Sequence, residues 1–310
     1  SGIGFVDNAT TGISAAIHSL KLTKEDEILT TNHVYNGVRQ LLIKRARGTG
    51  SSYRELHVPF PAPPTDELAS IIIESLKPNV KVLVVDHVSS ATALIFPINE
   101  LICACKQKGI SIIVDGAHAP GMLPFESWDV DPDWYVGNLH KWVCAPLGAA
   151  FLWTSESHRS HTHPLTISHF LDRSYIEEFN WQGTKDISPW LTVFDAIQRL
   201  TPEQWRDQMQ TNHERAIEFE QAWLAQFPVD SMYATVEQFG SMVTVRLPIL
   251  GDSSLEEADA FRDSLYKEHN VEIPVFLFEN KLFTRFSVQD YVKHEWVCQF
   301  IEIIKESKVS

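Results

Sequence analysis

The feature that most constrains the fold is an order repeated along the first part of the chain, in which a short apolar run ends in a polar residue and a helical pattern follows. Apolar runs at 81–86, 112–115 and 134–137 indicate buried strands. Helical patterns at 65–76 and 99–108 lie between them. Strands that alternate with helices favour a sheet wound on both faces by right-handed crossovers. The sequence therefore predicts an α/β fold with a mainly parallel, doubly wound sheet.

Two of the residues at the strand ends carry complementary chemistry. Asp115 closes the run that begins at Ile112, and Lys141 lies on the turn before a further apolar strand at 149–153. In open α/β sheets the carboxyl ends of the strands face the ligand crevice. A lysine for a Schiff base and an anion for a protonated pyridine nitrogen are what a pyridoxal phosphate (PLP) site needs. Either residue alone is more often structural, so the neighbouring residues must decide.

Two junctions before helices offer further binding groups. The polar segment 7–12 precedes a helical pattern at 13–20, where free backbone N–H groups form an anion site, although an ordinary Asn or Thr cap fits as well. His33 and Tyr35 lie at another strand-to-helix junction. One of these rings could stack on a planar cofactor. The alternative is an aromatic side chain half-buried under the loop.

The last third of the chain predicts a separate, smaller α+β domain. We expect a large domain at 1–200, and a connecting helix with the small domain at 201–310. The patterns indicate a helix at 202–227, a strand at 242–247, a helix at 255–269, strands at 271–276 and 282–288, and a helix at 292–305. Arg285 lies within the last strand, where a lone cation is costly unless it meets an anion. It forms either a salt bridge inside the domain or a bidentate clamp for a substrate carboxylate.

Composition excludes several other functions. The net charge is -14 with a pI near 5.3, and no basic stretch is interleaved with aromatic residues, so we expect neither nucleic-acid nor membrane binding. No apolar run is long enough to span a membrane and no signal peptide opens the chain, which favours a cytoplasmic location. The four cysteines indicate no disulfide framework. The histidine-rich loop 158–164 lacks a local carboxylate or cysteine, so we expect no metal site.

Taken together, these residues resemble the class V aminotransferase family of fold type I PLP enzymes, and most of all its isopenicillin N epimerase-like branch. The resemblance covers essentially the whole chain. It rests on five motifs in order: Asn8-Ala9-Thr10, Asp115-Gly116-Ala117-His118-Ala119-Pro120-Gly121, Gly137-Asn138-Leu139-His140-Lys141-Trp142, Gln182-Gly183-Thr184-Lys185-Asp186, and Arg285-Phe286-Ser287 followed by Tyr291.

The resemblance implies a role for each matching residue. Lys141 forms the Schiff base and moves the Cα proton, Asp115 holds the pyridinium proton, and His118 lies near the phenolic oxygen. The phosphate is bound by Ala9, Thr10, Asn138 and His140, and by Thr184 of a neighbouring subunit, which implies a homodimer. His33 aligns with the ring-stacking histidine of cysteine desulfurases and Tyr35 is the second candidate, while Ser90 lies near a ring-side polar group. Arg285 grips the substrate α-carboxylate.

The implied activity is that of a PLP enzyme acting on an amino acid through an external aldimine and a quinonoid, by Cα epimerisation or by carbon–sulfur β-elimination. A class V aminotransferase and a non-catalytic or truncated binding protein are the alternatives. Cysteine desulfurases carry a persulfide-forming cysteine shortly before the clamp arginine, and 270–284 has none, so we expect this chain not to be one. Relatives also carry a further N-terminal segment, so we expect the chain to be a fragment or to have lost that segment.

Overall fold

The structure is a computed structural model that describes residues 2–124, 131–249 and 251–307. Two compact units make up the chain. The first unit comprises Ser1–Val58, Thr65–Ser90 and Ile95–Trp205. The second unit comprises Pro59–Pro64, Ala91–Leu94 and Arg206–Ser310. Each unit has its own sheet.

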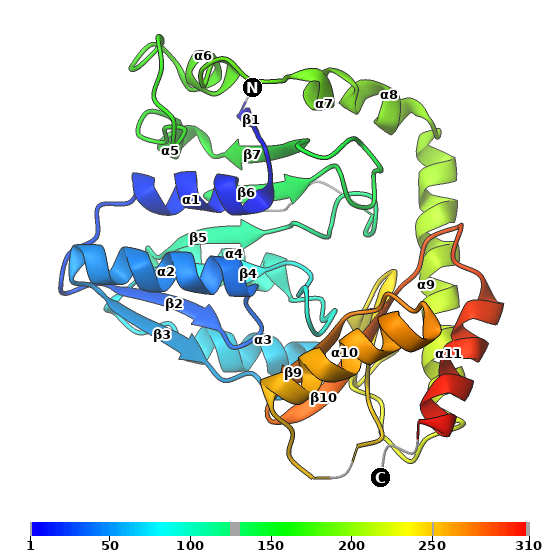
Figure 1. The fold of residues 1–310 in the computed structure, drawn as a ribbon. Coiled ribbons are helices and arrows are strands. Elements are labelled where there is room, and N and C mark those ends of the chain that lie inside the picture. The colour runs from blue at the N-terminus through cyan, green and yellow to red at the C-terminus, as the bar shows by residue number, and fades with distance from the viewer. Residues whose placement is uncertain (1, 125–130, 250, 308–310) are drawn as a thin grey trace. The chain divides into compact units, whose positions relative to one another are not determined.

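The first unit alternates strands and helices, as the sequence predicts (Figure 1). Its strands are β1 Ile3–Val6, β2 Glu27–Thr31, β3 Ser52–Leu56, β4 Val80–Asp86, β5 Ser111–Asp115, β6 Trp134–Asn138 and β7 Ala150–Thr154. Its helices are α1 Ala9–Ser19, α2 Asn36–Thr49, α3 Thr65–Glu74, α4 Ile98–Lys108, α5 Glu156–Arg159, α6 Tyr175–Asn180, α7 Ser188–Leu191 and α8 Val193–Gln198.

The sheet of the first unit has seven strands in the order β1-β7-β6-β5-β4-β2-β3. The pairs β6-β5, β5-β4, β4-β2 and β2-β3 are parallel, whereas β7 runs antiparallel to both β6 and β1. The prediction of a mainly parallel α/β sheet is therefore confirmed. The edge strand β1 was not predicted, because it has only four residues and depends on its pairing with β7.

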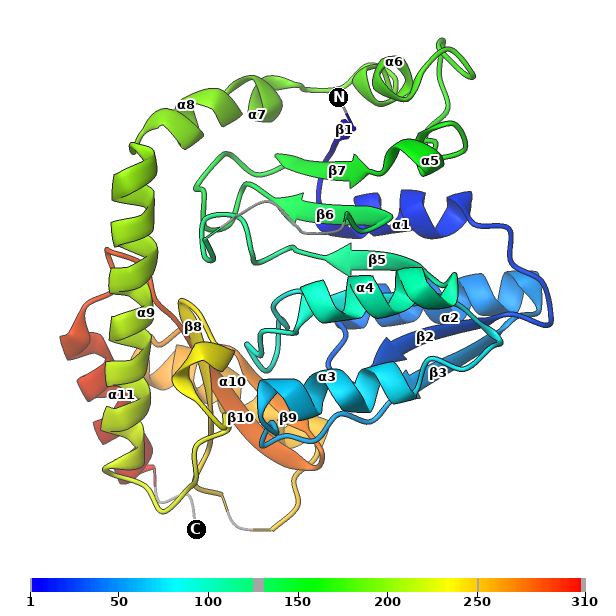
Figure 2. The same ribbon diagram turned by 180° about the vertical axis from the view of Figure 1, so that it is seen from behind.

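Helices cover both faces of this sheet. Figure 1 shows α1 and α2 in front of the strands, and the reverse view in Figure 2 shows α3 and α4 on the opposite face. Strands covered on both sides are apolar throughout, which explains the apolar runs of β4, β5 and β6. The core under α1 and α2 includes Ile13, Ile17, Val38, Leu42, Val82, Val84, Ile113 and Val136, all buried.

The helix α1 begins earlier than predicted, at Ala9 instead of 13. The Asn8 side chain caps it by accepting a hydrogen bond from the Thr11 N–H at 2.9 Å. Thr10 consequently lies in the first helical turn, where backbone N–H groups have no intrahelical partner. This turn contains no acidic residue, so the partial positive charge of the helix end is not neutralised within it.

The second unit contains a three-stranded antiparallel sheet in the order β8-β10-β9. Its elements are α9 Pro202–Leu224, which begins in the first unit, the 3₁₀ turn η1 Val236–Gln238, β8 Met242–Arg246, α10 Leu255–His269, β9 Val275–Phe278, β10 Lys281–Ser287 and α11 His294–Glu306. Trp223 packs its ring on Phe286 and Phe300 and forms the centre of an aromatic core. None of the helices within the described ranges is both long enough and apolar enough to cross a bilayer.

One predicted strand of this unit starts late. The expected strand at 271–276 begins only at Val275. Asn270 adopts a left-handed conformation at the end of α10, and the Val271 N–H donates back to the Leu265 carbonyl. That N–H therefore closes the helix and cannot join a strand ladder.

Candidate active site

The carboxyl ends of three parallel strands bring polar side chains to one edge of the sheet of the first unit. Asp86 ends β4 and Asp115 ends β5, and the two are direct partners in the register. Both are buried, with 2% and 3% of their surface exposed. Asn138 ends the neighbouring strand β6. This is the edge at which open α/β sheets bind ligands.

Asp115 is a buried carboxylate within the electrostatic reach of Lys141. Its Oδ1 accepts a hydrogen bond from the Ala117 N–H at 3.0 Å. Burial raises the pKa of Asp115, while the Ala117 hydrogen bond and the positive charge of Lys141 lower it. The Ala117 N–H and the Lys141 charge thus partly offset the cost of burying the negative charge of Asp115.

Asp86 is a second buried carboxyl group that we did not assign to the site from the sequence. Burial and the neighbouring Asp115 charge hold the pKa of Asp86 well above its usual range. Two adjacent carboxyl groups cannot both ionise cheaply in a buried site. We infer that Asp86 carries a proton and that Asp115, which has Lys141 nearby, carries the negative charge. The position of Asp86 at the end of β4 was the only sequence signal.

Lys141 lies in hydrogen-bonding contact with His118. The Lys141 Nζ is 2.9 Å from the His118 Nε2. The Trp142 Nε1–H donates to the His118 Nδ1 in a long hydrogen bond of 3.4 Å. The turn that carries Lys141 is fixed from within by hydrogen bonds from the Cys144 N–H to the Lys141 carbonyl and from the Ala145 N–H to Leu139. An acid–base pair is thereby held close to Asp115.

Gly116 allows the chain to pass from Asp115 to His118. A Cβ atom at position 116 would lie 2.2 Å from the Tyr135 Cζ, which is far inside van der Waals contact. The Tyr135 hydroxyl in turn lies 2.9 Å from the His87 Nδ1. The glycine in this motif is therefore explained by a close approach of the backbone to an aromatic ring.

The N-terminus of α1 is attached to the end of β6. The Ala9 N–H donates to the Asn138 Oδ1 at 2.9 Å, so it is already engaged. The next residue, Thr10, is half-buried in the same turn. His140 lies two residues beyond Asn138, and its Nδ1 is 2.9 Å from the Ala149 carbonyl oxygen, which leaves Nε2 as its other polar atom. Burial lowers the pKa of His140.

His33 and Tyr35 have very different surroundings. His33 is 2% exposed, its Nε2 lies 3.1 Å from the Val58 carbonyl oxygen, and its ring meets the Phe96 ring edge-on at 5.7 Å. Burial lowers the pKa of His33 to about 4. Tyr35 is 48% exposed. Because a ring can stack on a bound cofactor only through an accessible face, Tyr35 offers a stacking surface that His33 lacks. Ser90 is half-buried just beyond β4.

The two remaining predicted residues, Arg285 and Thr184, do not belong to the strand ends described above. Arg285 belongs to β10 of the second unit, where burial lowers its pKa to about 10. It lines a cavity of about 930 Å³ within that unit, together with Arg262 and His269. Thr184 is exposed on a loop of the first unit, where Lys185 forms an ion pair with Asp7 at 2.8 Å.

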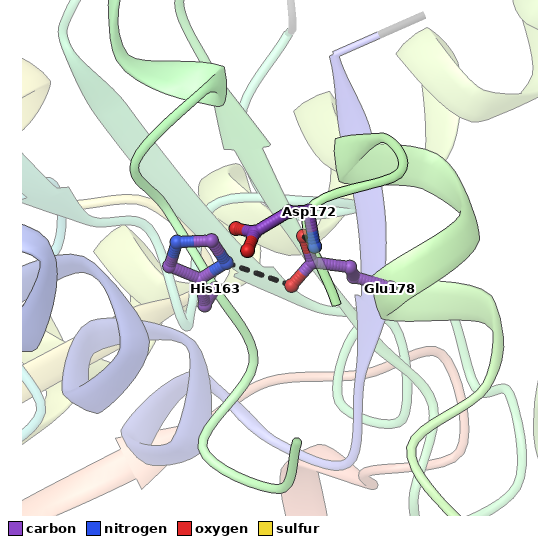
Figure 3. Close-up of side chains that lie close together, drawn as sticks. All are labelled: His163, Asp172 and Glu178. Atoms are coloured by element: carbon purple, nitrogen blue, oxygen red, sulfur yellow. Dashed lines mark hydrogen bonds and ion pairs between the residues drawn. The ribbon is translucent and has the colours of Figure 1, made fainter. Parts of the chain in front are cut away.

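The expectation of no metal at the histidine-rich loop considered local sequence spacing alone, and it stays a prediction. The sequence shows no carboxylate close to His163, but the fold brings Asp172 and Glu178 beside it (Figure 3). The short helix α6 and the turn before it return the chain to the loop. The spacing of residues along the sequence does not reveal that Asp172 and Glu178 fold back beside His163.

The family model for class V aminotransferases matches residues 1–256. The chain belongs to this family, as its motifs indicated. Among curated relatives, an L-cysteine desulfhydrase of Arabidopsis thaliana is 28% identical over 292 residues, which cover 88% of this chain and 64% of that protein. An isopenicillin N epimerase of Streptomyces clavuligerus is 28% identical over 295 residues, which cover 88% of this chain and 72% of that protein.

The chain spans less than two thirds of the length of several desulfhydrases that it matches, between 61% and 64%. Among solved structures, a mutant of the lyase C-DES with glycine covalently linked to its PLP cofactor has a TM-score of 0.76 and 20% identity, covering 98% of this chain and 80% of that one. Apo cysteine desulfurase from Thermococcus onnurineus NA1 has a TM-score of 0.75 and 18% identity, covering 99% and 79%. These likenesses confirm the fold.

The expectation that cysteine desulfurase chemistry is excluded was wrong. L-cysteine desulfhydrases are among the relatives, and cysteine desulfurases are among the structures of the same fold. The expectation rested on the missing cysteine in 270–284. Loss of sulfur from Cβ of a substrate needs a leaving group on that substrate, and it does not need a protein thiol to accept the sulfur. The missing cysteine therefore does not decide whether sulfur is removed.

Proposed function

We propose that this chain acts as a PLP-dependent enzyme that removes the Cα proton of a sulfur-containing amino acid and cleaves its Cβ–S bond. The observation that carries the proposal is the Lys141–His118 contact at 2.9 Å beside the buried carboxylate of Asp115. The family and its desulfhydrase relatives support it.

The residues present fit the cofactor. PLP needs an amine, an anion for its pyridine nitrogen and donors for its phosphate. Lys141 supplies the amine and Asp115 supplies a carboxylate whose negative charge is favoured by the Ala117 N–H. The first turn of α1, which has no acidic side chain, supplies a positive helix end.

When bound, the cofactor draws electrons from the bonds at Cα of an attached amino acid. Lys141 would hold the cofactor through its amine, and the same amine would take the Cα proton. His118 keeps the Lys141 amine in place and lies where it can exchange a proton with it. Asp115 would hold a proton on the pyridine nitrogen of the bound cofactor, and a protonated Asp86 would limit the negative charge beside Asp115.

Four residues orient the cofactor in this proposal. Thr10 donates to the phosphate through its backbone N–H and hydroxyl. His140 donates from Nε2, since its Nδ1 is engaged with the Ala149 carbonyl. Asn138 holds α1 in position through the Ala9 N–H and can offer its amide N–H groups. Tyr35 stacks on the ring, because His33 is packed away from solvent.

The substrate carboxylate is assigned to Arg285. Its planar guanidinium can bind a carboxylate through two parallel hydrogen bonds. Its location among apolar strand residues lowers the competition from water, as the fall in its pKa to about 10 indicates. Ser90 is proposed as a polar group beside the cofactor ring.

A homodimer is proposed, with Thr184 reaching the phosphate of the neighbouring subunit. The support is a set of large apolar side chains exposed on one stretch of the first unit, namely Leu165, Ile167, Leu171, Trp181, Ile187, Leu191, Phe194 and Ile197, each at least 42% exposed. Large apolar side chains that a single segment exposes to solvent favour an interaction surface. A cytoplasmic location stays a prediction from composition.

Epimerisation at Cα is the second candidate. The isopenicillin N epimerase relatives are as similar in sequence as the desulfhydrases and match over a larger share of their length. Epimerisation requires return of the proton to the opposite face of Cα. In that case a second proton donor must lie on the face of Cα opposite Lys141, and the exposed Tyr35 is the candidate.

The proposal is tested with purified protein loaded with PLP. We expect the visible absorption of lysine-bound cofactor in the wild type and its loss in Lys141→Ala, while the far-ultraviolet circular dichroism stays unchanged. Incubation with L-cysteine, cysteine-conjugate sulfoxides and isopenicillin-type tripeptides then separates the two candidates. Pyruvate and sulfide indicate Cβ–S cleavage, and inversion without pyruvate indicates epimerisation. Wild-type protein that binds no cofactor contradicts both.

A further inference from the structure

The histidine-rich loop that the proposed function does not use meets two carboxylates. His163 comes from the loop after α5, Asp172 from the turn before α6, and Glu178 from α6 itself (Figure 3). The His163 Nδ1 is 2.7 Å from the Glu178 Oε2, and the Asp172 N–H donates to the Glu178 Oε1 at 3.1 Å. One potential ligand atom from each residue lies within 4.8 Å of the others. All three residues belong to the first unit.

The charges in this cluster do not balance. Glu178 is 7% exposed, yet within the described part of the chain no lysine or arginine pairs with it or with Asp172. His163 contacts the buried Glu178, and the exposed Asp172 adds a second carboxylate beside them. Burying a carboxylate is costly unless it is compensated. The surroundings therefore favour an additional cation at this place.

We propose that His163, Asp172 and Glu178 bind a divalent cation, with Zn²⁺ as the best match. One imidazole nitrogen and two carboxylate oxygens are usual zinc ligands, and a water completes a tetrahedron. Ca²⁺ and Mg²⁺ favour sites made of oxygen atoms alone. The ion takes the place of the hydrogen bond between His163 and Glu178, and the ligands bind it in their deprotonated forms. The ligand atoms then lie about 3.3 Å from one another, the edge of a tetrahedron with bonds of about 2.0 Å. The His163 Nδ1 and the Glu178 Oε2 move apart from 2.7 Å, and the more distant atoms of the cluster approach one another.

Such an ion would fix a surface segment. It links the two ends of 163–172, a stretch that exposes Leu165, Ile167 and Leu171. It also ties that stretch to α6, which packs on β1 and places Phe179 against Gly4. The expected role is structural. The proposal is independent of the PLP chemistry, and either can fail without the other.

The test uses the full chain, stripped of metal by chelation and then titrated with Zn²⁺ by calorimetry and with Co²⁺ by visible absorption. We expect one equivalent to bind, a rise in the unfolding temperature, and Co²⁺ bands of low-symmetry coordination. His163→Ala and Asp172→Asn should each weaken binding by more than roughly 100-fold, since even the loss of an outer-shell partner costs about 10–100-fold. Asp172 is exposed, so its replacement keeps the fold.

The matched control is His169→Ala, which removes an exposed histidine from the same segment but lies outside the cluster. It should bind Zn²⁺ like the wild type. Zinc taken up by the exposed thiols of Cys144 or Cys298 would survive both ligand substitutions. The proposal would be overturned if the wild type bound no stoichiometric Zn²⁺, or if the two ligand variants bound Zn²⁺ as tightly as the wild type. It would also be overturned if His169→Ala lost as much affinity as the ligand variants.

Discussion

At the residue scale, the contact between Lys141 and His118 defines what the site can do with a proton. Their 2.9 Å separation brings together two groups that can each accept and release one. We expect His118→Gln to retain the cofactor and its visible absorption, because Lys141 and Asp115 remain. The turnover number should fall by about 100-fold, the lower end of what positioned acid–base groups contribute. Pre-steady-state kinetics with a Cα-deuterated substrate provide the measurement.

A residue that only supports the fold would behave differently. It would lower the unfolding temperature and leave the isotope effect unchanged. If His118→Gln turns over substrate at the wild-type rate, the assigned role of His118 is wrong.

Tyr35 and His33 give a second test at this scale. Tyr35→Ala should weaken PLP binding by about 10-fold, because aromatic stacking contributes roughly 0.5–1.5 kcal/mol, and should leave thermal stability close to wild type. His33→Ala should mainly destabilise the protein, since it removes a buried ring from Phe96 and the contact with Val58. Cofactor titration and thermal unfolding of both variants check this. The reverse pattern would identify His33 as the stacking ring.

Single residues differ in how far their place could be predicted. Asp115 and Lys141 could be found from strand ends, because parallel strands bring their carboxyl ends together. The role of His118 followed only from family resemblance. The burial of His33 depends on Val58, 25 residues away, and on Phe96, which local sequence patterns do not reveal.

At the element scale, helices were predicted best where their ends carry chemical signals. The bounds of α10 agree with the prediction, because Ser254 and Glu257 form a capping box and Asn270 ends the helix in a left-handed conformation. α1 was predicted too short, because its first turn is made of small polar residues whose helical state depends on the Asn8 cap. β1 escaped prediction, since pairing with β7 is what makes it a strand.

The elements α7 and α8 carry a test of the proposed dimer. Leu191 is 69% exposed and Phe194 is 64% exposed. We expect the double variant Leu191→Asp, Phe194→Asp to run as a monomer in analytical ultracentrifugation, because two charges cannot be buried unpaired in an interface. Tyr266→Asp is the matched control, as Tyr266 is 61% exposed on α10 of the second unit. A double variant that sediments like the wild type would place the interface elsewhere.

At the scale of the whole molecule, buried ionisable groups couple folding to pH. The pKa of Asp86 lies well above its ordinary value of 3.8 because of burial and the Asp115 charge. Its contribution to stability is complete below that value. It is lost as pH rises toward the folded pKa, because the unfolded chain releases the proton first. The free energy of unfolding of Asp86→Asn, relative to that of the wild type, should therefore rise by about 1.4 kcal/mol per pH unit above about pH 4. Urea unfolding across pH measures it, and a constant difference would show that Asp86 is ionised in the fold.

His33 should show the opposite dependence. Burial lowers its pKa from 6.5 to about 4, so the stability that goes with its neutral form is present above pH 6.5 and is lost as pH falls to 4. The loss amounts to about 3 kcal/mol, at 1.36 kcal/mol per pKa unit. His33→Gln can still donate to the Val58 carbonyl but takes up no proton, so its stability relative to the wild type should rise as pH falls through this window. Asp86 ends β4 and His33 follows the end of the neighbouring parallel strand β2. Opposite slopes for Asp86→Asn and His33→Gln would show that the fold holds both in their neutral forms.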